Sequence, residues 1–152
     1  MRDDYLFRGK SEGEIWRKGD LMRGFFPSSI EKIQWCIQFI YSSRPETSFF
    51  TSLPVDPVTV GRCTGVKDEN GNLVFEGDIV KIYDKIAEKY MLGIIIWQHG
   101  QFIIDVQNVT GNNGLDNFWE LINTISTTGI ANVEIIGNIH DNPELLPIES
   151  EE

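Results

Sequence analysis

Residues 32–41, KIQWCIQFIY, carry the clearest periodic signal in the chain and decide its fold class. β-branched and aromatic side chains recur at every second position, namely Ile33, Trp35, Ile37, Phe39 and Tyr41. Because successive side chains of a strand point to opposite faces, this period of two predicts a half-buried β-strand. The alternative is a helix capped by Ser28 or Ser29, with Glu31 in its first turn. A helix would scatter the five bulky residues around its circumference, which favours the strand.

The segments on either side of this strand predict an amino-terminal β unit and a seam after it. Residues 5–26 favour short antiparallel strands, with one turn at KSEG (residues 10–13) and a second break at RKGD (residues 17–20). Pro45, Pro54 and Pro57 then remove backbone donors and restrict the residues before them. We therefore expect an amino-terminal β unit over residues 1–53, a carboxy-terminal unit over 54–146 and an acidic tail over 147–152.

Residues 58–106 predict further strands joined by glycine-containing turns. VTVGRCTGV (58–66) and NLVFEGDIVKIY (72–83) flank the Asn70-Gly71 dipeptide, which is typical of a tight hairpin. Two more strands are expected at residues 93–97 and 101–106, joined at Gln98-His99-Gly100. The order of these strands predicts a strongly bent sheet or small SH3-like barrel in the carboxy-terminal unit.

Residues 110–139 predict a loop, a short helix and a last strand. TGNNG (110–114) is the loop, and Asp116 is expected to cap a helix that carries Phe118, Trp119, Glu120, Leu121 and Ile122. A buried strand over 133–139 closes the pattern. The expected fold is therefore mainly β with minor α content.

Composition excludes several classes of function. The net charge is −10, from 13 basic and 23 acidic residues, which disfavours non-specific nucleic-acid binding because phosphate recognition needs clustered cations. Cys36 and Cys63 lack CxxC spacing, which favours an intracellular protein with reduced thiols, in the cytoplasm, while their pairing stays open. No run of about 18 apolar residues occurs, so we expect no membrane span.

The residue patterns predict no catalytic centre, metal site or cofactor. An EF-hand loop beginning at Asp68 would need Gly and Glu where the chain has Leu73 and Ile79. His99 and His140 have no neighbours at metal-ligand spacing, and GxSxG, phosphate-loop and Rossmann motifs are absent from the sequence. A small enzyme stays open as an alternative if carboxylates or His140 gather in one pocket. A nucleic-acid binder that uses Arg17, Lys18 and Arg23 is another.

Three separated blocks resemble the YopX family, which is known from bacteriophages, prophages and bacterial mobile elements. They are TGVKDENG (64–71), EGDIV (76–80) and VEIIGNIHDNPEL (133–145). The opening FRGK (7–10) also resembles the family, although Gly9-Lys10 departs from its usual pattern.

The resemblance implies a phage-derived, mostly β, cytoplasmic protein that assembles with itself, with no catalytic residues to carry over. We interpret the polar and glycine residues of the blocks as a structural motif: Gly65, Asp68, Asn70, Gly71, Gly77, Asp78, Gly137, Asn138, Asn142 and Pro143. The glycines and Asn70 permit turn geometry, and Pro143 ends the last strand. The leading hypothesis is a homo-oligomeric accessory protein that binds a host or phage protein.

Overall fold

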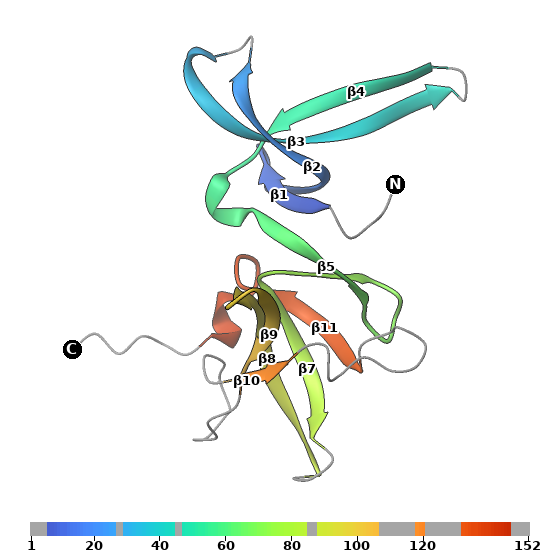
Figure 1. The fold of residues 1–152 in the computed structure, drawn as a ribbon, viewed down its shortest axis with the longest axis vertical. Helices are drawn as coiled ribbons and strands as arrows, with labels where there is room; N and C mark the ends of the chain where they lie inside the picture. Colours follow the sequence, from blue (N-terminus) through green and yellow to red (C-terminus); the bar gives the residue numbers. More distant parts are fainter. Residues whose placement is uncertain are drawn as a thin grey trace, which may run out of the picture. The chain divides into compact units, whose positions relative to one another are not determined.

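The fold was obtained as a computed structural model, which describes residues 6–26, 29–44, 47–84, 88–106, 118–120 and 132–146 (Figure 1). The chain divides into two compact units, Met1–Cys63 and Thr64–Glu152. The division falls inside a strand, β5 (Gly61–Lys67), and lies after the proline-containing segment in which the sequence predicts a seam. Each unit is built on antiparallel β-sheet, as the sequence predicts.

The amino-terminal unit is an antiparallel sheet in the order β4-β3-β2-β1-β5. Its strands are β1 (Phe7–Ser11), β2 (Ile15–Phe26), β3 (Ser29–Arg44) and β4 (Thr47–Pro54), followed by the 3-10 turn η2 (Pro57–Thr59) and the start of β5. The turn predicted at KSEG joins β1 to β2, where Ser11 pairs with Ile15 and Gly13 has φ 79°. Figure 1 shows β3 and β4 as a long hairpin that extends away from β1.

The predicted break at RKGD is wrong, because β2 runs through it without interruption. The first half of β2 pairs with β1, up to Gly19 opposite Phe7, and the second half pairs with β3, beginning at Asp20 opposite Gln38. A Cβ at Gly19 would overlap the carbonyl oxygen of Gln38. Glycine here therefore serves a close approach between two strands and does not end a strand.

The strand predicted from residues 32–41 is confirmed as part of β3, and the helical alternative is excluded. Ile37 on the predicted apolar face is fully buried, and Trp35 is half-buried. Cys36, on the opposite face, is also fully buried. The period of two therefore identifies the strand correctly. It does not predict that both faces are buried at Cys36 and Ile37, because that depends on how the rest of the unit packs.

The carboxy-terminal unit contains a five-stranded antiparallel sheet in the order β10-β9-β8-β7-β11. Its strands are β7 (Asp78–Asp84), β8 (Lys89–Gln98), β9 (Gln101–Asp105), β10 (Phe118–Glu120) and β11 (Val133–Asn138). The short strand β6 (Leu73–Phe75) pairs with β5, and the 3-10 turn η4 (Pro143–Leu145) follows β11. Within the described residues, no ladder joins β10 to β11, so this part of the chain forms a sheet, bent or flat, and not an established barrel.

Both faces of the five-stranded sheet bury apolar side chains, which explains the nearly continuous hydrophobic runs in its strands. One face forms a core with β6: Val74, Val80, Ile82, Ile95, Ile104, Val106 and Val133. On the other face Ile79 and Ile94 pack against residues of β8 and of the segment after β11: Leu92, Ile96, Ile139, Leu145 and Leu146. Consecutive residues of β7 and β8 therefore belong to different cores.

The two predicted hairpins differ in turn geometry. Between β8 and β9, His99 and Gly100 both have positive φ, at 52° and 83°, which is the backbone of a type I′ turn. Between β5 and β6 the positive φ lies at Gly71, 83°, and not at Asn70. The Gly71 amide donates to the carbonyl of Asp68 at 3.0 Å, so the turn spans Asp68 to Gly71. Asn70 lies inside this turn, as expected, but without positive φ.

The helix predicted to begin at Asp116 is also wrong for the residues that the structure describes there. Phe118, Trp119 and Glu120 form β10, which pairs with Asp105, Ile104 and Ile103 of β9. The edge of β9 supplies backbone partners that a short isolated helix lacks, so tertiary pairing overrides the local cap signal. The predicted loop 110–114, Asp116, Leu121 and Ile122 lie outside the described residues.

Candidate functional site

Asp68, in the first shared block, is fully buried and accepts hydrogen bonds from both sides of its turn. Oδ1 accepts from the amides of Asn70 at 3.0 Å and Asn72 at 2.7 Å. Oδ2 accepts from Asn72 Nδ2 at 3.3 Å and from the Ile135 amide of β11 at 3.4 Å. The carboxylate thus holds the β5–β6 turn in shape and joins it to β11, a strand far along the chain.

Asp78 and Gly77, in the second block, connect the start of β7 to its neighbours. Asp78 is buried, and its Oδ2 accepts from the Phe75 amide at 2.8 Å. Gly77 has φ 85°, donates to the carbonyl of Ile95 at 2.8 Å and accepts from the Ile139 amide at 2.9 Å. Because a residue with a Cβ rarely adopts this φ, glycine permits both contacts.

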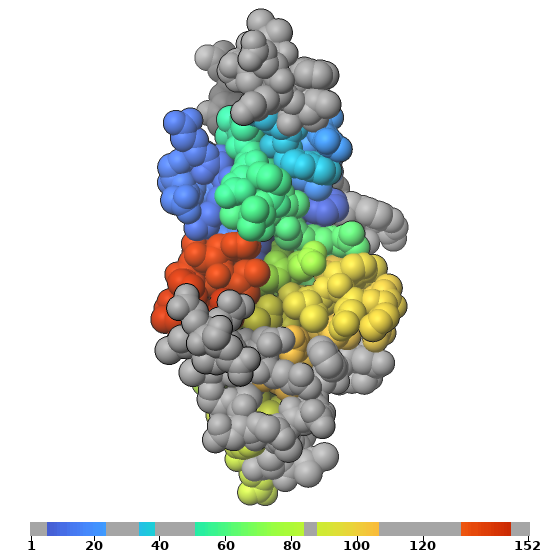
Figure 2. Space-filling model, turned by 90° about the vertical axis from the view of Figure 1, so that its left-hand side faces the viewer, coloured from blue at the N-terminus to red at the C-terminus, as the bar shows by residue number. Residues whose placement is uncertain are grey.

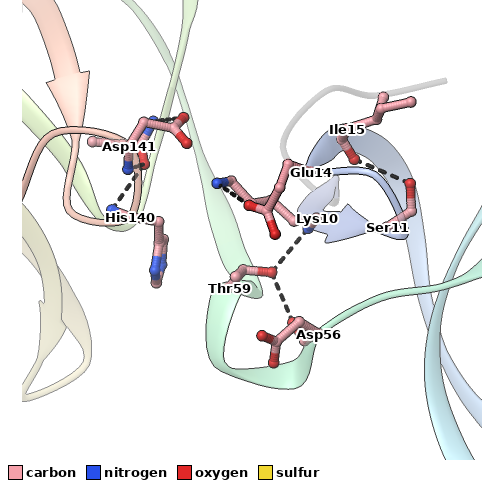
Figure 3. Close-up of polar contacts among 9 residues, drawn as sticks. Lys10, Ser11, Glu14, Ile15, Asp56, Thr59, His140 and Asp141 are labelled. Atoms are coloured by element: carbon pink, nitrogen blue, oxygen red, sulfur yellow. Dashed lines mark hydrogen bonds and ion pairs between the residues drawn. The ribbon is translucent and has the colours of Figure 1, made fainter.

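The third block forms a compact polar turn after β11. Asn138 Oδ1 accepts from the amides of His140 and Asp141, each at 3.0 Å, and its Nδ2 donates to Asp141 Oδ2 at 2.7 Å. Figure 3 labels His140 and Asp141 of this turn. Asn142 closes the turn, donating through its amide to the Asn138 carbonyl at 2.9 Å. A Cβ at Gly137 would overlap Asn142 Oδ1. Pro143 then begins η4.

The block residues therefore form three hydrogen-bonded turns, and the first and second are each bonded to the third block, through the Ile135 and Ile139 amides. Among the described residues, no group of three or more His, Cys, Asp and Glu side chains has the geometry to hold a metal ion. Asp68, Asn138 and Asn142 form hydrogen bonds within their own turns, and Asp68 also accepts from the Ile135 amide of β11. That the blocks carry no chemistry stays a prediction.

A second feature, which sequence reasoning missed, is a set of cations stacked on tryptophan in the amino-terminal unit. Arg8 Cζ lies 4.7 Å from the centroid of the Trp16 ring, and Lys10 Nζ lies 5.5 Å from it. Lys10 is opposite Trp16 in the β1–β2 ladder, so the hairpin register is the signal that would have found the pair. Arg23 covers Trp35 in the same way at 5.5 Å.

Lys10 also anchors η2 to β1. Its amide donates to Thr59 Oγ1 at 2.8 Å, and the Thr59 hydroxyl donates to the Asp56 carbonyl at 2.7 Å (Figure 3). Its ammonium is paired with Glu14 at 2.6 Å. The anchored turn presents Val58, which is 77% exposed, and Figure 2 shows this green segment at the surface of the unit.

A third feature, also missed from the sequence, is an exposed aromatic cluster on β7, β8 and β11, here called the tyrosine patch: Lys81, Tyr83, Tyr90 and Glu134. Tyr83 and Tyr90 face each other across the ladder with ring centroids 5.0 Å apart. Lys81 Nζ lies 4.2 Å from the Tyr90 centroid and 3.8 Å from Glu134 Oε2. The tyrosines are 45% and 63% exposed.

Charge is distributed unequally between the two units. Residues 1–63 contain nine basic and eight acidic residues, a net charge of +1. Residues 64–152 contain four basic and fifteen acidic residues, a net charge of −11. The overall charge of −10 therefore belongs to the carboxy-terminal unit, of which the acidic end is one part.

Both cysteines are buried free thiols, so the open question of a Cys36–Cys63 disulfide is answered in the negative. Burial raises the pKa of the Cys36 thiol above its ordinary value, because the thiolate loses hydration. Across the described residues, no helix has the length and apolar character required to cross a bilayer.

The geometry defines a mainly β protein of two antiparallel units whose shared sequence blocks shape turns. The model of the YopX family, described as YopX protein, matches residues 7–147. The chain belongs to the YopX family, as the three blocks predict.

Solved structures that are similar in fold include the two described next, and no curated protein matches the chain. The crystal structure of protein EF1440 from Enterococcus faecalis has 24% identity and a TM-score of 0.52, covering 94% of this chain and 97% of that one. The X-ray crystal structure of protein yopX from Bacillus subtilis has 19% identity and a TM-score of 0.50, covering 95% and 99%. At 24% and 19% sequence identity, these similarities show a shared fold and nothing further.

Proposed function

We propose that the chain is a phage- or prophage-encoded accessory protein that works in the host cytoplasm by binding, as a homo-oligomer that pairs through β4. The observation that carries the proposal is the position of β4 at the edge of the amino-terminal sheet. Within the described residues, β4 is paired with β3 on one side. Family membership supports the phage origin, and a host or phage protein is the proposed further partner.

The sequence of β4 makes it an unusually permissive edge. An exposed edge strand presents unpaired N–H and C=O groups, and proteins normally protect such edges with charged residues, proline or bulges. The eight residues of β4, TSFFTSLP, contain no charged residue, and Pro54 stands at the very end. A second copy is the simplest occupant, because two identical strands pair antiparallel about a two-fold axis and close the assembly.

The ladder register identifies which β4 amides point outward. The Val55 amide donates to the Trp35 carbonyl at 2.9 Å, so these two residues form a hydrogen-bonded pair. Because such pairs alternate along an antiparallel ladder, Leu53, Thr51 and Phe49 point their amides toward β3. The amides of Ser52, Phe50 and Ser48 therefore point outward, away from β3. The backbone nitrogen of Pro54, which carries no hydrogen, also faces outward.

This register supplies a matched pair of proline variants for sedimentation analysis. Ser52→Pro removes an outward amide and leaves the β3–β4 ladder intact, so we expect a discrete wild-type assembly to dissociate to the 17.3 kDa chain. Ser52→Lys should do the same by placing a charge on the edge. Thr51→Pro removes an amide that bonds β3, so it should unfold the unit. A wild-type chain that sediments as a monomer at high micromolar concentration would refute self-assembly, and an assembly insensitive to both Ser52 variants would refute the edge.

Nucleic-acid binding through Arg17, Lys18 and Arg23 is the alternative function, and the higher share of basic residues in the amino-terminal unit favours it. Base stacking requires accessible aromatic faces. Trp16 and Trp35 each have a face occupied by a cation of the same unit, which reduces that capacity. A salt-dependent mobility shift with single-stranded nucleic acid would support the alternative, and no shift at low salt would end it.

The carboxy-terminal sheet is the proposed SH3-like element. The three successive antiparallel strands β7, β8 and β9 support this description. A crystal structure in which a hydrogen-bonded ladder closes the sheet between its edge strands would establish a barrel. An open sheet in that structure would refute the SH3-like description.

A further inference from the structure

The tyrosine patch combines exposed aromatic rings with carboxylate in a way that suits a cation. Lys81, Tyr83, Tyr90 and Glu134 lie on one face of the sheet, because Tyr83 is paired with Tyr90 and Lys81 with Glu134 across their ladders. Farther along the same face, Ile79 and Ile94 are covered by residues that follow β11. The patch therefore lies on the same face of the sheet as this small core, at the end where the side chains are exposed to solvent.

The chain itself shows that the Tyr90 ring accepts a cation. The Lys81 ammonium lies 4.2 Å from the Tyr90 centroid, within the distance over which the ring quadrupole attracts positive charge. The same ammonium is 3.8 Å from Glu134, so ring and carboxylate act on one cation together. Tyr90 is 63% exposed and Tyr83 45%, which leaves ring surface for a second cation.

The electrostatics decide the sign of the partner. Among the described residues of these strand ends, Lys81 and Lys89 stand against Asp84, Glu88 and Glu134, so the local charge is −1 and offers no preference for an anion. The surrounding unit has a net charge of −11, which attracts cations and repels anions. Because the Debye length is about 8 Å at physiological ionic strength and longer at low salt, the attraction of the whole unit for a basic partner should be strongest at low salt.

We infer that the tyrosine patch is a docking surface for a basic, arginine-bearing segment of a partner protein. Guanidinium groups stack on aromatic rings and pair with carboxylates at once, so arginine matches this combination better than lysine. The amino-terminal unit of a second copy is a poorer match, because its net charge is +1.

The test is a titration of the full-length chain with an arginine hexapeptide, read from the NMR signals of the Tyr83 and Tyr90 rings. We expect these signals to shift, with the affinity falling as salt is added. Tyr90→Ser should weaken binding about two- to fivefold, since a cation–π contact at an exposed site is worth that much, and Tyr83→Ser/Tyr90→Ser should weaken it about tenfold. Tyr90→Phe keeps the ring and should bind nearly as wild type. A glutamate hexapeptide should leave the signals unchanged.

Two outcomes would overturn the inference. Equal affinity of wild type and the double variant would show that the peptide binds the unit's overall negative charge and not the rings. Shifts produced by the glutamate peptide would show the opposite sign of partner. Repeating the titration with Ser52→Lys separates this surface from β4, because the patch should bind in that variant whether or not the chain self-assembles.

Discussion

The contacts of Asp68 make Asp68→Ala the most informative substitution for the carboxy-terminal unit. The variant removes a buried carboxylate that accepts from Asn70, Asn72 and Ile135. Hydrogen bonds to a charged group each contribute about 1.5–3 kcal/mol, but the amides of the exposed residues Asn70 and Asn72 regain water when the carboxylate is lost. We therefore expect a loss of about 2–4 kcal/mol in the free energy of unfolding of this unit.

Urea unfolding followed through the amide NMR signals of Ile82 and Ile95 would report this unit separately from the other. With a slope of about 2 kcal/mol/M, the midpoint should fall by about 1–2 M. Hydrogen exchange at the Ile135 amide should also accelerate, because its acceptor is lost. Glu69→Ala is the control, since Glu69 is exposed and its loss should change stability by less than about 0.5 kcal/mol. An Asp68→Ala variant as stable as this control would refute the structural role of the first block.

Two further predictions concern the amino-terminal unit and its cysteines. Gly19→Ala should destabilise the unit by about 3 kcal/mol or more, because the added Cβ meets the Gln38 carbonyl oxygen, and a thermal melt would show it; an unchanged melting temperature would contradict the close approach. Cys36 should resist a thiol-specific reagent at mildly alkaline pH, because the residue is fully buried and its raised pKa lowers the thiolate fraction, whereas urea-unfolded chain should react fully. Rapid labelling of native Cys36 would contradict that burial.

Two errors in the sequence predictions share one cause, which is that contacts with residues distant in the chain set the local structure. RKGD at residues 17–20 contains an ordinary turn signal, but Gly19 is required because Gln38 approaches the backbone there. Asp116 is an ordinary cap signal, but Phe118–Glu120 pairs with β9. At Asn70-Gly71, the dipeptide predicts the turn correctly, while the Asp68 hydrogen bonds select the form in which Gly71 alone has positive φ within the turn.

The sequence by itself determined the β class, the principal strands, the hairpin positions and the family, because period-two alternation, Asn-Gly and the three shared blocks are local signals. Tertiary structure alone decided that Asp68 reaches Ile135, that Trp16 lies beneath Arg8 and Lys10, and that Lys81, Tyr83, Tyr90 and Glu134 meet on one surface. Such meetings depend on strand order and register, which arise from how whole strands pack and which no short window of residues encodes.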